Sequence, residues 1–248
     1  MQKTVDDIEM NKPLFEAVTL KLSTDCIPNS FIACLIGKPG SGKTTYLRTV
    51  LTNPNLYLGK FDYVYIISPS IAQYRDICDE KQMNPVLDIK WIADKINTIN
   101  KNDKDKSINI LFVLDDVISQ VKDLSKNDDF ISFFLNRRHI CWNGTVSIFL
   151  VAQKYTMVPC KLRSNITWLV LFNMSQIDID KIREEHVVAY NKKQWLNAFQ
   201  VAYKNQYGFI QFDVENKLIF HKFKKMEVEA INYPLFKPLI NSIKSFNN

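Results

Sequence analysis

The feature that most constrains this chain is an apolar run that leads directly into a cluster of glycines. Residues 31–36 read FIACLI, and residues 37–44 read GKPGSGKT, which holds three of the six glycines in the chain. An apolar run that ends at glycine indicates a buried strand, and glycines allow the backbone to turn tightly after it. The residues that follow predict a helix from Lys43 to about Leu51. We therefore expect a strand, a tight loop and a helix in succession.

Residues 37–44 also match the pattern G-x-x-x-x-G-K-[ST], which binds the phosphates of nucleotides. In such a loop the backbone N–H groups surround phosphate oxygens, and the helix directs its positive N-terminal end at them. The pattern predicts that Lys43 contacts the β- and γ-phosphates and that Thr44 offers its hydroxyl group to Mg²⁺. A glycine-rich turn without a ligand is the alternative. The predicted nucleotide-binding residues are Gly37, Lys38, Pro39, Gly40, Ser41, Gly42, Lys43, Thr44 and Thr45.

A second motif supplies the carboxylates that a metal-bound nucleotide needs. Residues 110–117 read ILFVLDDV, an apolar strand that ends in two acids. We expect Asp115 to hold Mg²⁺, directly or through water, and Asp116 to activate the attacking water as a general base. A carboxylate at the second position favours hydrolysis over simple binding. For Asp116 the alternative is a cap at the N-terminus of the next helix.

The rest of the chain alternates apolar runs with helical segments, which predicts an α/β fold with a mostly parallel central sheet and helices on both faces. No linker rich in proline, glycine or serine divides the chain, so we expect a single domain. Its parts would be an N-terminal arm (1–25), the core motifs (26–178), and C-terminal helices with a hairpin (179–248), of which the last dozen residues form a second arm. Further strands are expected at residues 63–67, 108–114, 145–151 and 167–172, helices at 91–100, 130–140, 178–187 and 194–203, and the hairpin at 209–214 and 218–223.

The composition excludes several other classes of protein. Hydrophobic residues make up 46% of the chain and the net charge is +6, which suits a globular protein and permits a polyanionic partner without requiring one. The five cysteines form no C-x-x-C pair and have no histidine at a metal-ligand spacing, which argues against disulfides and zinc and favours a reducing compartment. The acidic N-terminal segment is not a secretory signal, and no uncharged apolar run reaches the ~18 residues of a membrane span, so we expect no membrane partner.

Two further features could serve the nucleotide site. Gln153 follows the apolar strand at 145–151, where it could sense the γ-phosphate or position water, or be an ordinary turn residue. Residues 130–177 contain no Asp or Glu, a composition that suits contact with the phosphates of DNA or of a neighbouring subunit's nucleotide, or else a solvated basic face. The basic residues of this segment are Arg137, Arg138, Lys154, Lys161 and Arg163.

Two other classes of phosphate-binding protein fit less well. The Asn-Lys-x-Asp tetrad that selects guanine is absent, since residues 191–194 read NKKQ. A small-molecule kinase would need an arginine-rich lid, and the few arginines of this chain form no such cluster. The sequence therefore favours an ATPase.

The chain resembles the genome-packaging ATPases of poxviruses and other large DNA viruses, which belong to the FtsK–HerA superfamily of DNA-pumping motors. Six segments carry the resemblance in this order: GKPGSGKTTYL, YVYIISPS, FVLDDV, FFLNRRHI, SIFLVAQ and VPCKLRSNITWLVLF. Together they cover about residues 30–180, and similar ATPases occur in virophages and virus-like transposons. The resemblance implies a P-loop NTPase fold of the RecA and FtsK–HerA type.

The resemblance also implies an activity and partners. Such proteins hydrolyse ATP with Mg²⁺ and move double-stranded DNA into a capsid, working as pentameric or hexameric rings. Gln153 would sense the γ-phosphate, and an arginine of the next subunit would complete each site. Arg163 and Arg138 are the candidates for that arginine, with Arg137 behind them. A capsid vertex protein would be a further partner, and the protein would lie in the virion or in viral replication factories of the host cytoplasm.

Two alternatives remain open: a nucleotide-gated capsid assembly factor that does not translocate DNA, and a nucleotide kinase. Residues from Asp178 onward resemble the family only weakly, and no nuclease constellation is present. The basic end of the hairpin, with Lys222, Lys224 and Lys225, could line a pore or form a subunit contact. We expect it instead to be a solvated face.

Overall fold

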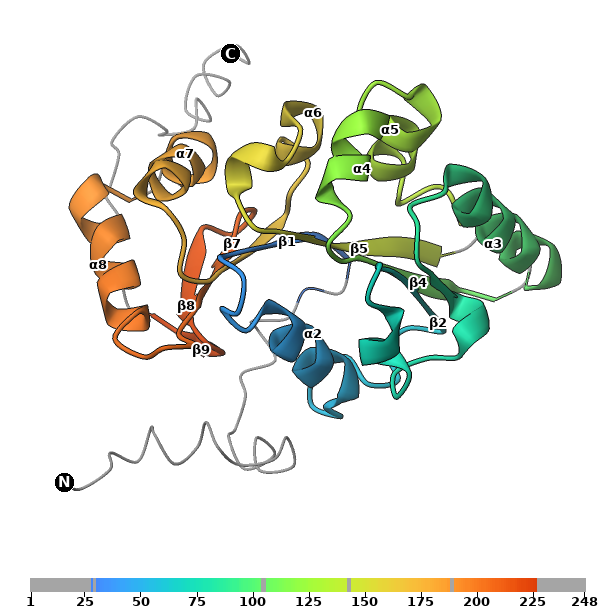
Figure 1. The fold of residues 1–248 in the computed structure, drawn as a ribbon, viewed down its shortest axis with the longest axis horizontal. Coiled ribbons are helices and arrows are strands. Elements are labelled where there is room, and N and C mark those ends of the chain that lie inside the picture. The colour runs from blue at the N-terminus through green and yellow to red at the C-terminus, as the bar shows by residue number, and fades with distance from the viewer. Residues whose placement is uncertain (1–27, 29, 104–105, 142–143, 188–189, 227–248) are drawn as a thin grey trace, which may run out of the picture.

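The structure is a computed structural model that describes residues 28, 30–103, 106–141, 144–187 and 190–226. The predicted arms at residues 1–25 and in the last dozen residues lie outside these ranges. The described residues form a nine-stranded sheet with the order β3-β2-β4-β5-β1-β6-β7-β8-β9, and helices lie against both of its faces (Figure 1). Neighbouring strands from β3 to β6 run parallel, whereas β7, β8 and β9 pair antiparallel. The predicted α/β fold is therefore confirmed.

The central strands lie where the apolar runs predict them. Every residue of β1 and of β6 is buried, because helices or loops cover both faces of the sheet there. The two strands that the sequence does not predict, β3 and β9, are each two residues long and form the ends of the sheet. The strands are β1 (Ile32–Ile36), β2 (Tyr63–Ile67), β3 (Met83–Asn84), β4 (Ile108–Leu114), β5 (Gly144–Ala152), β6 (Trp168–Leu171), β7 (Ile210–Asp213), β8 (Leu218–His221) and β9 (Lys224–Lys225).

The helices divide unequally between the two faces. Alternate residues of β1 point into two separate cores, with Ala33 and Leu35 facing α2 (Lys43–Thr52) and Ile32 facing the other layer. Figure 1 shows α2 on one side of the sheet, and the short 3₁₀ helix Ile71–Tyr74 packs into the same core. The opposite layer holds α3 (Ile89–Asn102), α4 (Ile118–Leu124), α5 (Asp128–Leu135), α6 (Cys160–Arg163), α7 (Gln176–His186) and α8 (Lys192–Ala202). Among the helices of the described ranges, none combines the length and hydrophobicity that spanning a bilayer demands.

One predicted helix, at residues 130–140, has different bounds in the structure. The helix, α5, begins at Asp128 because the side chain of Asn127 accepts a hydrogen bond from the N–H of Phe130 and caps it. It ends at Leu135, and residues 136–140 form a turn and a bend. The apolar pattern extends to Ile140, which packs against the core from that bend rather than from a helix. Arg137 and Arg138 therefore lie outside α5.

The predicted terminal hairpin is confirmed, and it also extends the central sheet. β7 pairs antiparallel with β6, so that Ile210 lies opposite Leu171, and β8 pairs with β7, so that His221 lies opposite Ile210. This register places the residues before β7 and after β8 beside the C-terminal ends of β1 and β6. The glycine-rich loop leaves β1 at the same end. The hairpin is thus a neighbour of the loop, which its distance in sequence does not reveal.

Candidate nucleotide-binding site

The glycine-rich loop begins where β1 ends, and the neighbouring strands fix its first residues. The N–H of Gly37 donates to the carbonyl oxygen of Ala152 at 3.3 Å, and the N–H of Lys38 donates to that of Asn173 at 3.0 Å. Gly37 has no room for a side chain, because a Cβ atom there would lie 2.5 Å from the Cβ atom of Phe172. The start of the loop is therefore held between the ends of β5 and β6.

The remainder of the loop turns through two glycines with positive φ. Gly40 has φ +72° and Gly42 has φ +100°, values that residues with side chains rarely adopt. Helix α2 then begins at Lys43, so its first N–H groups face the loop. The buried hydroxyl group of Ser41 has no hydrogen-bond partner within the described ranges. The turn and the helix start that the sequence predicts are thus present, and phosphate binding by this loop stays a prediction.

The side chain of Lys43 folds back over the loop. Its ammonium group donates to the carbonyl oxygens of Gly37 at 2.6 Å and of Lys38 at 2.9 Å. Burial lowers the pKa of Lys43, while the charges of Asp115 and Asp116 act in the opposite direction. The two carboxylates therefore help to keep this partly buried lysine charged, which contact with a phosphate requires.

Asp115 lies at the end of β4 and makes a hydrogen bond that the sequence does not predict. The hydroxyl group of Tyr74, at the end of a short 3₁₀ helix (Ile71–Tyr74), donates to Oδ2 of Asp115 at 2.5 Å. Burial raises the pKa of Asp115, and the hydrogen bond from Tyr74 opposes that effect. Burial also raises the pKa of Tyr74, partly offset by a hydrogen bond with Thr44. The tyrosine hydroxyl thus lies between the two predicted Mg²⁺ ligands.

Asp116 is exposed and has φ +58°, an uncommon backbone conformation for a residue with a side chain. It does not cap the next helix, because α4 has Val117 at its N-cap position and no side-chain cap hydrogen bond. The alternative interpretation of Asp116 as a helix cap is therefore wrong. The strain is of the kind that proteins retain at functional sites.

A cavity of about 200 Å³ brings the predicted catalytic residues together. It opens at the ends of β1, β4 and β5, where parallel strands present their carboxyl ends to one edge of the sheet. The exposed Gln153 follows β5 directly and reaches the same cavity as the loop and the acid pair. The predicted site residues that line it are Pro39, Gly40, Lys43, Thr44, Asp115, Asp116 and Gln153.

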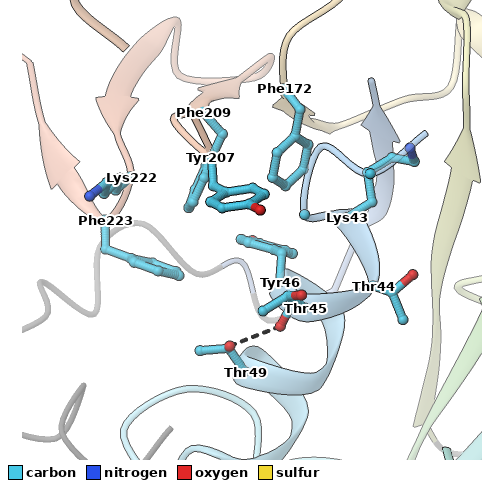
Figure 2. A pocket seen from close by; sticks show the side chains of 12 residues that line it. Lys43, Thr44, Thr45, Tyr46, Thr49, Phe172, Tyr207, Phe209, Lys222 and Phe223 are labelled. Carbon is cyan, nitrogen blue, oxygen red and sulfur yellow. Dashed lines mark hydrogen bonds between the residues drawn. The ribbon is translucent and has the colours of Figure 1, made fainter. Parts of the chain in front are cut away.

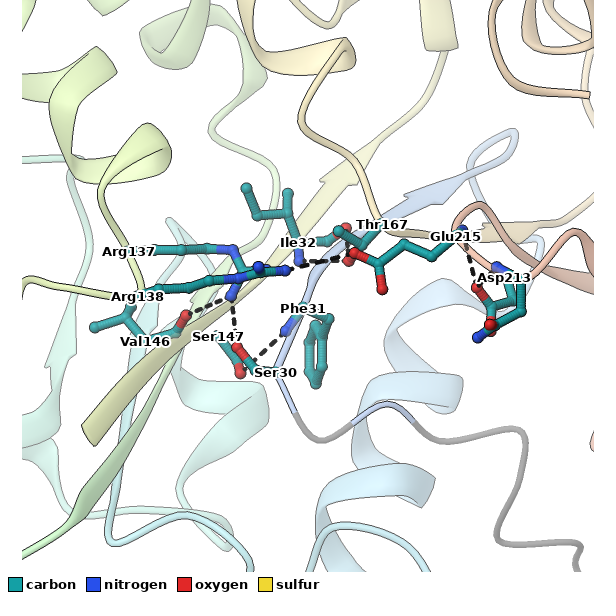
Figure 3. A network of polar contacts seen from close by, with 11 residues as sticks. Ser30, Phe31, Ile32, Arg137, Arg138, Val146, Ser147, Thr167, Asp213 and Glu215 are labelled. Atoms are coloured by element: carbon teal, nitrogen blue, oxygen red, sulfur yellow. Dashed lines mark hydrogen bonds and ion pairs between the residues drawn. The ribbon is translucent and has the colours of Figure 1, made fainter. Parts of the chain in front are cut away.

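Two of the three predicted arginines lie far from the loop, near the residues where β1 and β5 begin (Figure 3). Arg137 is buried, and its guanidinium group donates to Oγ of Ser30 at 2.6 Å and to the carbonyl oxygen of Val146 at 3.4 Å. These partners lie near the starts of β1 and β5, whereas the glycine-rich loop lies at the end of β1. Arg138 is exposed and forms an ion pair of 3.5 Å with Glu215, in the turn between β7 and β8.

The third arginine, Arg163, is buried in a network within its own chain. Its guanidinium group lies 3.4 Å from Oε1 of Glu185, 2.7 Å from Sγ of Cys160 and 5.1 Å from the ring centre of Tyr155. The hydroxyl group of Tyr155 donates to Oε2 of Glu185 at 2.6 Å and lies 2.7 Å from Nε2 of His186. The network ties α6 to α7.

A second hollow of about 590 Å³ adjoins the loop and extends towards the hairpin (Figure 2). It shares Gly40, Lys43 and Thr44 with the cavity that holds the acid pair. The prediction of a solvated face holds only in part for Lys222, which directly follows β8, is half-buried and lines this hollow. Lys224 and Lys225 are exposed, as that prediction expects.

Comparison with known sequences gives a match to the family profile described as Poxvirus A32 protein over residues 23–222. The match includes the hairpin, which the resemblance drawn from motifs leaves out. The DNA packaging protein OPG160 of variola virus is 30% identical over 182 residues, covering 69% of this chain and 63% of that protein. OPG160 of vaccinia virus strain Copenhagen is also 30% identical, with the same coverage. The chain thus spans a little under two thirds of the length of these curated relatives.

Solved structures show the same fold at low sequence identity. The genome packaging NTPase B204 of Sulfolobus turreted icosahedral virus 2, in complex with sulfate, superimposes with a TM-score of 0.58 at 16% identity. That alignment covers 79% of this chain and 98% of B204. The complex of B204 with ATP-gammaS superimposes with a TM-score of 0.55 at 17% identity, covering 81% of this chain and 100% of that one.

Proposed function

The chain belongs to the poxvirus A32 protein family, and we propose that it is an ATPase that moves double-stranded DNA into a viral capsid. The observation that carries the proposal is the cavity where Lys43, Thr44, Asp115, Asp116 and Gln153 meet. The names of the OPG160 relatives, DNA packaging proteins, support the DNA-packaging part. The B204 complex with ATP-gammaS supports a nucleotide ligand for this fold.

In this proposal each residue of the cavity has one role. The ammonium group of Lys43 leaves the loop carbonyl oxygens and contacts the phosphates as a positive charge. Asp116 accepts a proton from the water whose oxygen attacks the γ-phosphorus, and ADP leaves. Gln153 orients that water through its side-chain amide. The exposure of Asp116 and Gln153 suits both roles, because each must reach a water molecule.

The donor set beside the loop suits Mg²⁺. The hydroxyl group of Thr44 and the carboxylate of Asp115 are the oxygen ligands that this ion prefers, and nucleotide phosphates would complete the shell. Burial raises the pKa of Asp115 and so favours its neutral form. A dication beside it would have the opposite effect and favour the charged carboxylate, which is the form that binds a metal ion. When bound, Mg²⁺ would neutralise part of the phosphate charge. The hydroxyl group of Tyr74 holds the carboxylate of Asp115 in place for this role.

We further propose that the ATPase works as a pentameric or hexameric ring in which an arginine reaches the neighbour's nucleotide. Arg138 is the best placed of the three candidates, because its side chain is 58% exposed and its ion pair with Glu215 is a surface pair of small energy. It lies at the opposite end of the strands from the loop of its own chain. It can therefore contact a bound nucleotide phosphate only in another copy of the chain. Arg137 and Arg163 would first have to leave their partners within the chain.

The remaining partners follow from the proposed role. A packaging ATPase must contact double-stranded DNA and the capsid at the vertex where DNA enters. Such a protein acts in the virion or in the viral replication factories of the host cytoplasm. The net charge of +6 favours association with DNA at low salt.

The test is the steady-state rate of ATP hydrolysis, with and without long double-stranded DNA, at low salt and over a range of protein concentrations. We expect a Mg²⁺-dependent rate that rises with DNA and with protein concentration. Lys43→Ala and Asp115→Ala should abolish it. Lys81→Ala, which removes an exposed lysine away from the site, is the matched control and should behave as the parent does.

Two outcomes would contradict parts of the proposal. Hydrolysis that survives Lys43→Ala or Asp115→Ala would refute the assignment of the site. A slow rate that is indifferent to DNA and protein concentration would refute translocation by the isolated chain and favour the nucleotide-gated assembly factor. Phosphoryl transfer to a nucleoside monophosphate would instead identify a kinase.

A further inference from the structure

The second hollow beside the glycine-rich loop has an aromatic lining that no predicted role explains. It continues from the phosphate side of the loop, since Gly40, Lys43 and Thr44 line both it and the cavity that holds the acid pair. Its volume of about 590 Å³ lies in the range of small-molecule sites, about 300–1,000 Å³. The aromatic residues that line it are Tyr46, Phe172, Tyr207, Phe209 and Phe223.

Four separate segments bring these rings together (Figure 2). Tyr46 comes from α2 and Phe172 directly follows β6, whereas Tyr207 and Phe209 precede β7 and Phe223 follows β8. The antiparallel register of β7 on β6 carries the hairpin residues to the edge where the loop leaves β1. The hairpin is therefore what closes the hollow on its far side.

Most of the rings form a fixed wall. Tyr46 is stacked on Phe223 with ring centres 5.9 Å apart and planes 4° apart, and it meets Phe209 edge-on at 5.3 Å. Its hydroxyl group donates to Oε1 of Gln211 at 2.8 Å. Phe172 and Phe209 are buried, with ring centres 5.1 Å apart. A wall held by ring contacts and a buried hydrogen bond is pre-formed for a flat ligand.

Tyr207 differs from the other rings of the hollow. The residue is 41% exposed, and its ring makes no ring–ring contact within the described ranges. It lies directly over the loop, because a Cβ atom added to Gly42 would lie 3.7 Å from Cδ1 of Tyr207. The exposed ring of Tyr207 is close enough to the loop to stack on a ligand whose phosphates the loop holds.

We propose that this hollow binds the purine base of the nucleotide whose phosphates occupy the loop, with Tyr207 stacking on the base. The inference rests on the proposed nucleotide-binding function and adds the hairpin to that site. Aromatic side chains stack on a base through its π-face. The arrangement also orders the ligand: base at the hairpin, phosphates at the start of α2, and the γ-phosphate beside the acid pair.

The test compares the binding of ATP and of inorganic tripolyphosphate, which has the phosphates without the base, to the full chain in the presence of Mg²⁺. We expect Tyr207→Ala to weaken ATP binding by roughly 5- to 150-fold, the range for loss of one base–aromatic stack. Binding of tripolyphosphate should stay unchanged, and Tyr207→Phe, which keeps the ring, should bind ATP as the parent does. Val201→Ala is the matched control, because Val201 is 43% exposed and lies outside the hollow.

The outcomes separate this inference from the function on which it rests. If the parent hydrolyses ATP but Tyr207→Ala binds ATP as tightly as the parent, the base does not lie at Tyr207. Equal losses of ATP and tripolyphosphate binding would also overturn the inference, since they would indicate damage to the loop. A parent that binds neither ligand would overturn the nucleotide-binding function itself and the inference with it. Thermal unfolding of each variant shows that the fold is intact.

Discussion

Asp116 allows the backbone and the chemistry of the site to be tested separately. Its φ of +58° lies in the left-handed region, which glycine adopts freely, Asp and Asn adopt with moderate ease, and alanine adopts poorly. Its carboxylate is the proposed general base. Asp116→Asn, Asp116→Gly and Asp116→Ala all remove the carboxylate, but they differ in how well the backbone accepts the conformation.

The sizes of the two effects follow from these properties. A left-handed conformation costs a residue such as alanine about 1–2 kcal/mol, while glycine avoids that cost but loses about 0.5–1 kcal/mol more chain entropy on folding. We therefore expect the Gly variant to be more stable than the Ala variant by about 0.5–1 kcal/mol, which is a difference of about 1–4 °C in Tm for a chain of this size. Asn should unfold close to the parent. Loss of a general base should lower kcat by about 10²- to 10⁴-fold in all three variants.

The assay combines thermal unfolding with the steady-state rate of ATP hydrolysis at saturating ATP. The expected pattern is three different stabilities and one common loss of turnover, with ATP binding retained. Turnover by Asp116→Asn within a few fold of the parent would refute the assignment of Asp116 as the base. If the more stable variants turn over ATP faster than the less stable ones, Asp116 supports the backbone conformation and does not act as the base.

Three further predictions concern packing and charge. Gly37→Ala should lower the free energy of unfolding by about 1–3 kcal/mol in urea titrations, because its Cβ atom would lie 2.5 Å from that of Phe172; an unchanged midpoint would contradict the geometry of the loop. Burial lowers the pKa of His186, so below its ordinary pKa of about 6.5 the unfolded chain binds a proton that the fold resists, and stability should fall as the pH drops from 7 towards about 5. His186→Gln should flatten that pH dependence, and an equally steep dependence in the variant would assign it to other groups. Arg163→Met should destabilise the fold by about 1–2 kcal/mol through loss of its ion pair with Glu185, whereas unchanged Tm with lost turnover would favour a role towards a neighbouring subunit.

The parts of the site that the sequence predicts are those that depend on neighbours in the chain. The loop is recognisable because its glycines, Lys43 and Thr44 stand at fixed spacings between an apolar run and a helix. Asp115 and Asp116 are recognisable because they end an apolar strand. In a parallel sheet the ends of strands share an edge, so both predictions lead to the same cavity without knowledge of the pairing.

The parts that the sequence does not predict depend on distant pairing. Tyr74 belongs to a short 3₁₀ helix without an apolar period, and only the fold shows that its hydroxyl group reaches Asp115. The position of Tyr207 follows from the pairing of β7 with β6, which an isolated hairpin pattern does not specify. The sequence suggests that Arg163 is free to contact a ligand, because its partner Glu185 lies in a later helix and the pairing shows only in the fold.

The two ends of the sheet restrict how copies of this chain can associate. Within the described ranges, the end strands β3 and β9 are each two residues long, and β9 consists of two exposed lysines. So short an edge presents few free N–H and C=O groups to an approaching strand, and two like charges repel a second copy of the same edge. The fold therefore resists the strand-to-strand association that leads to aggregation. In the proposed ring, helices and loops of the described ranges would offer larger contact surfaces than these two strands, and such surfaces can slide or rotate against each other while each sheet stays intact.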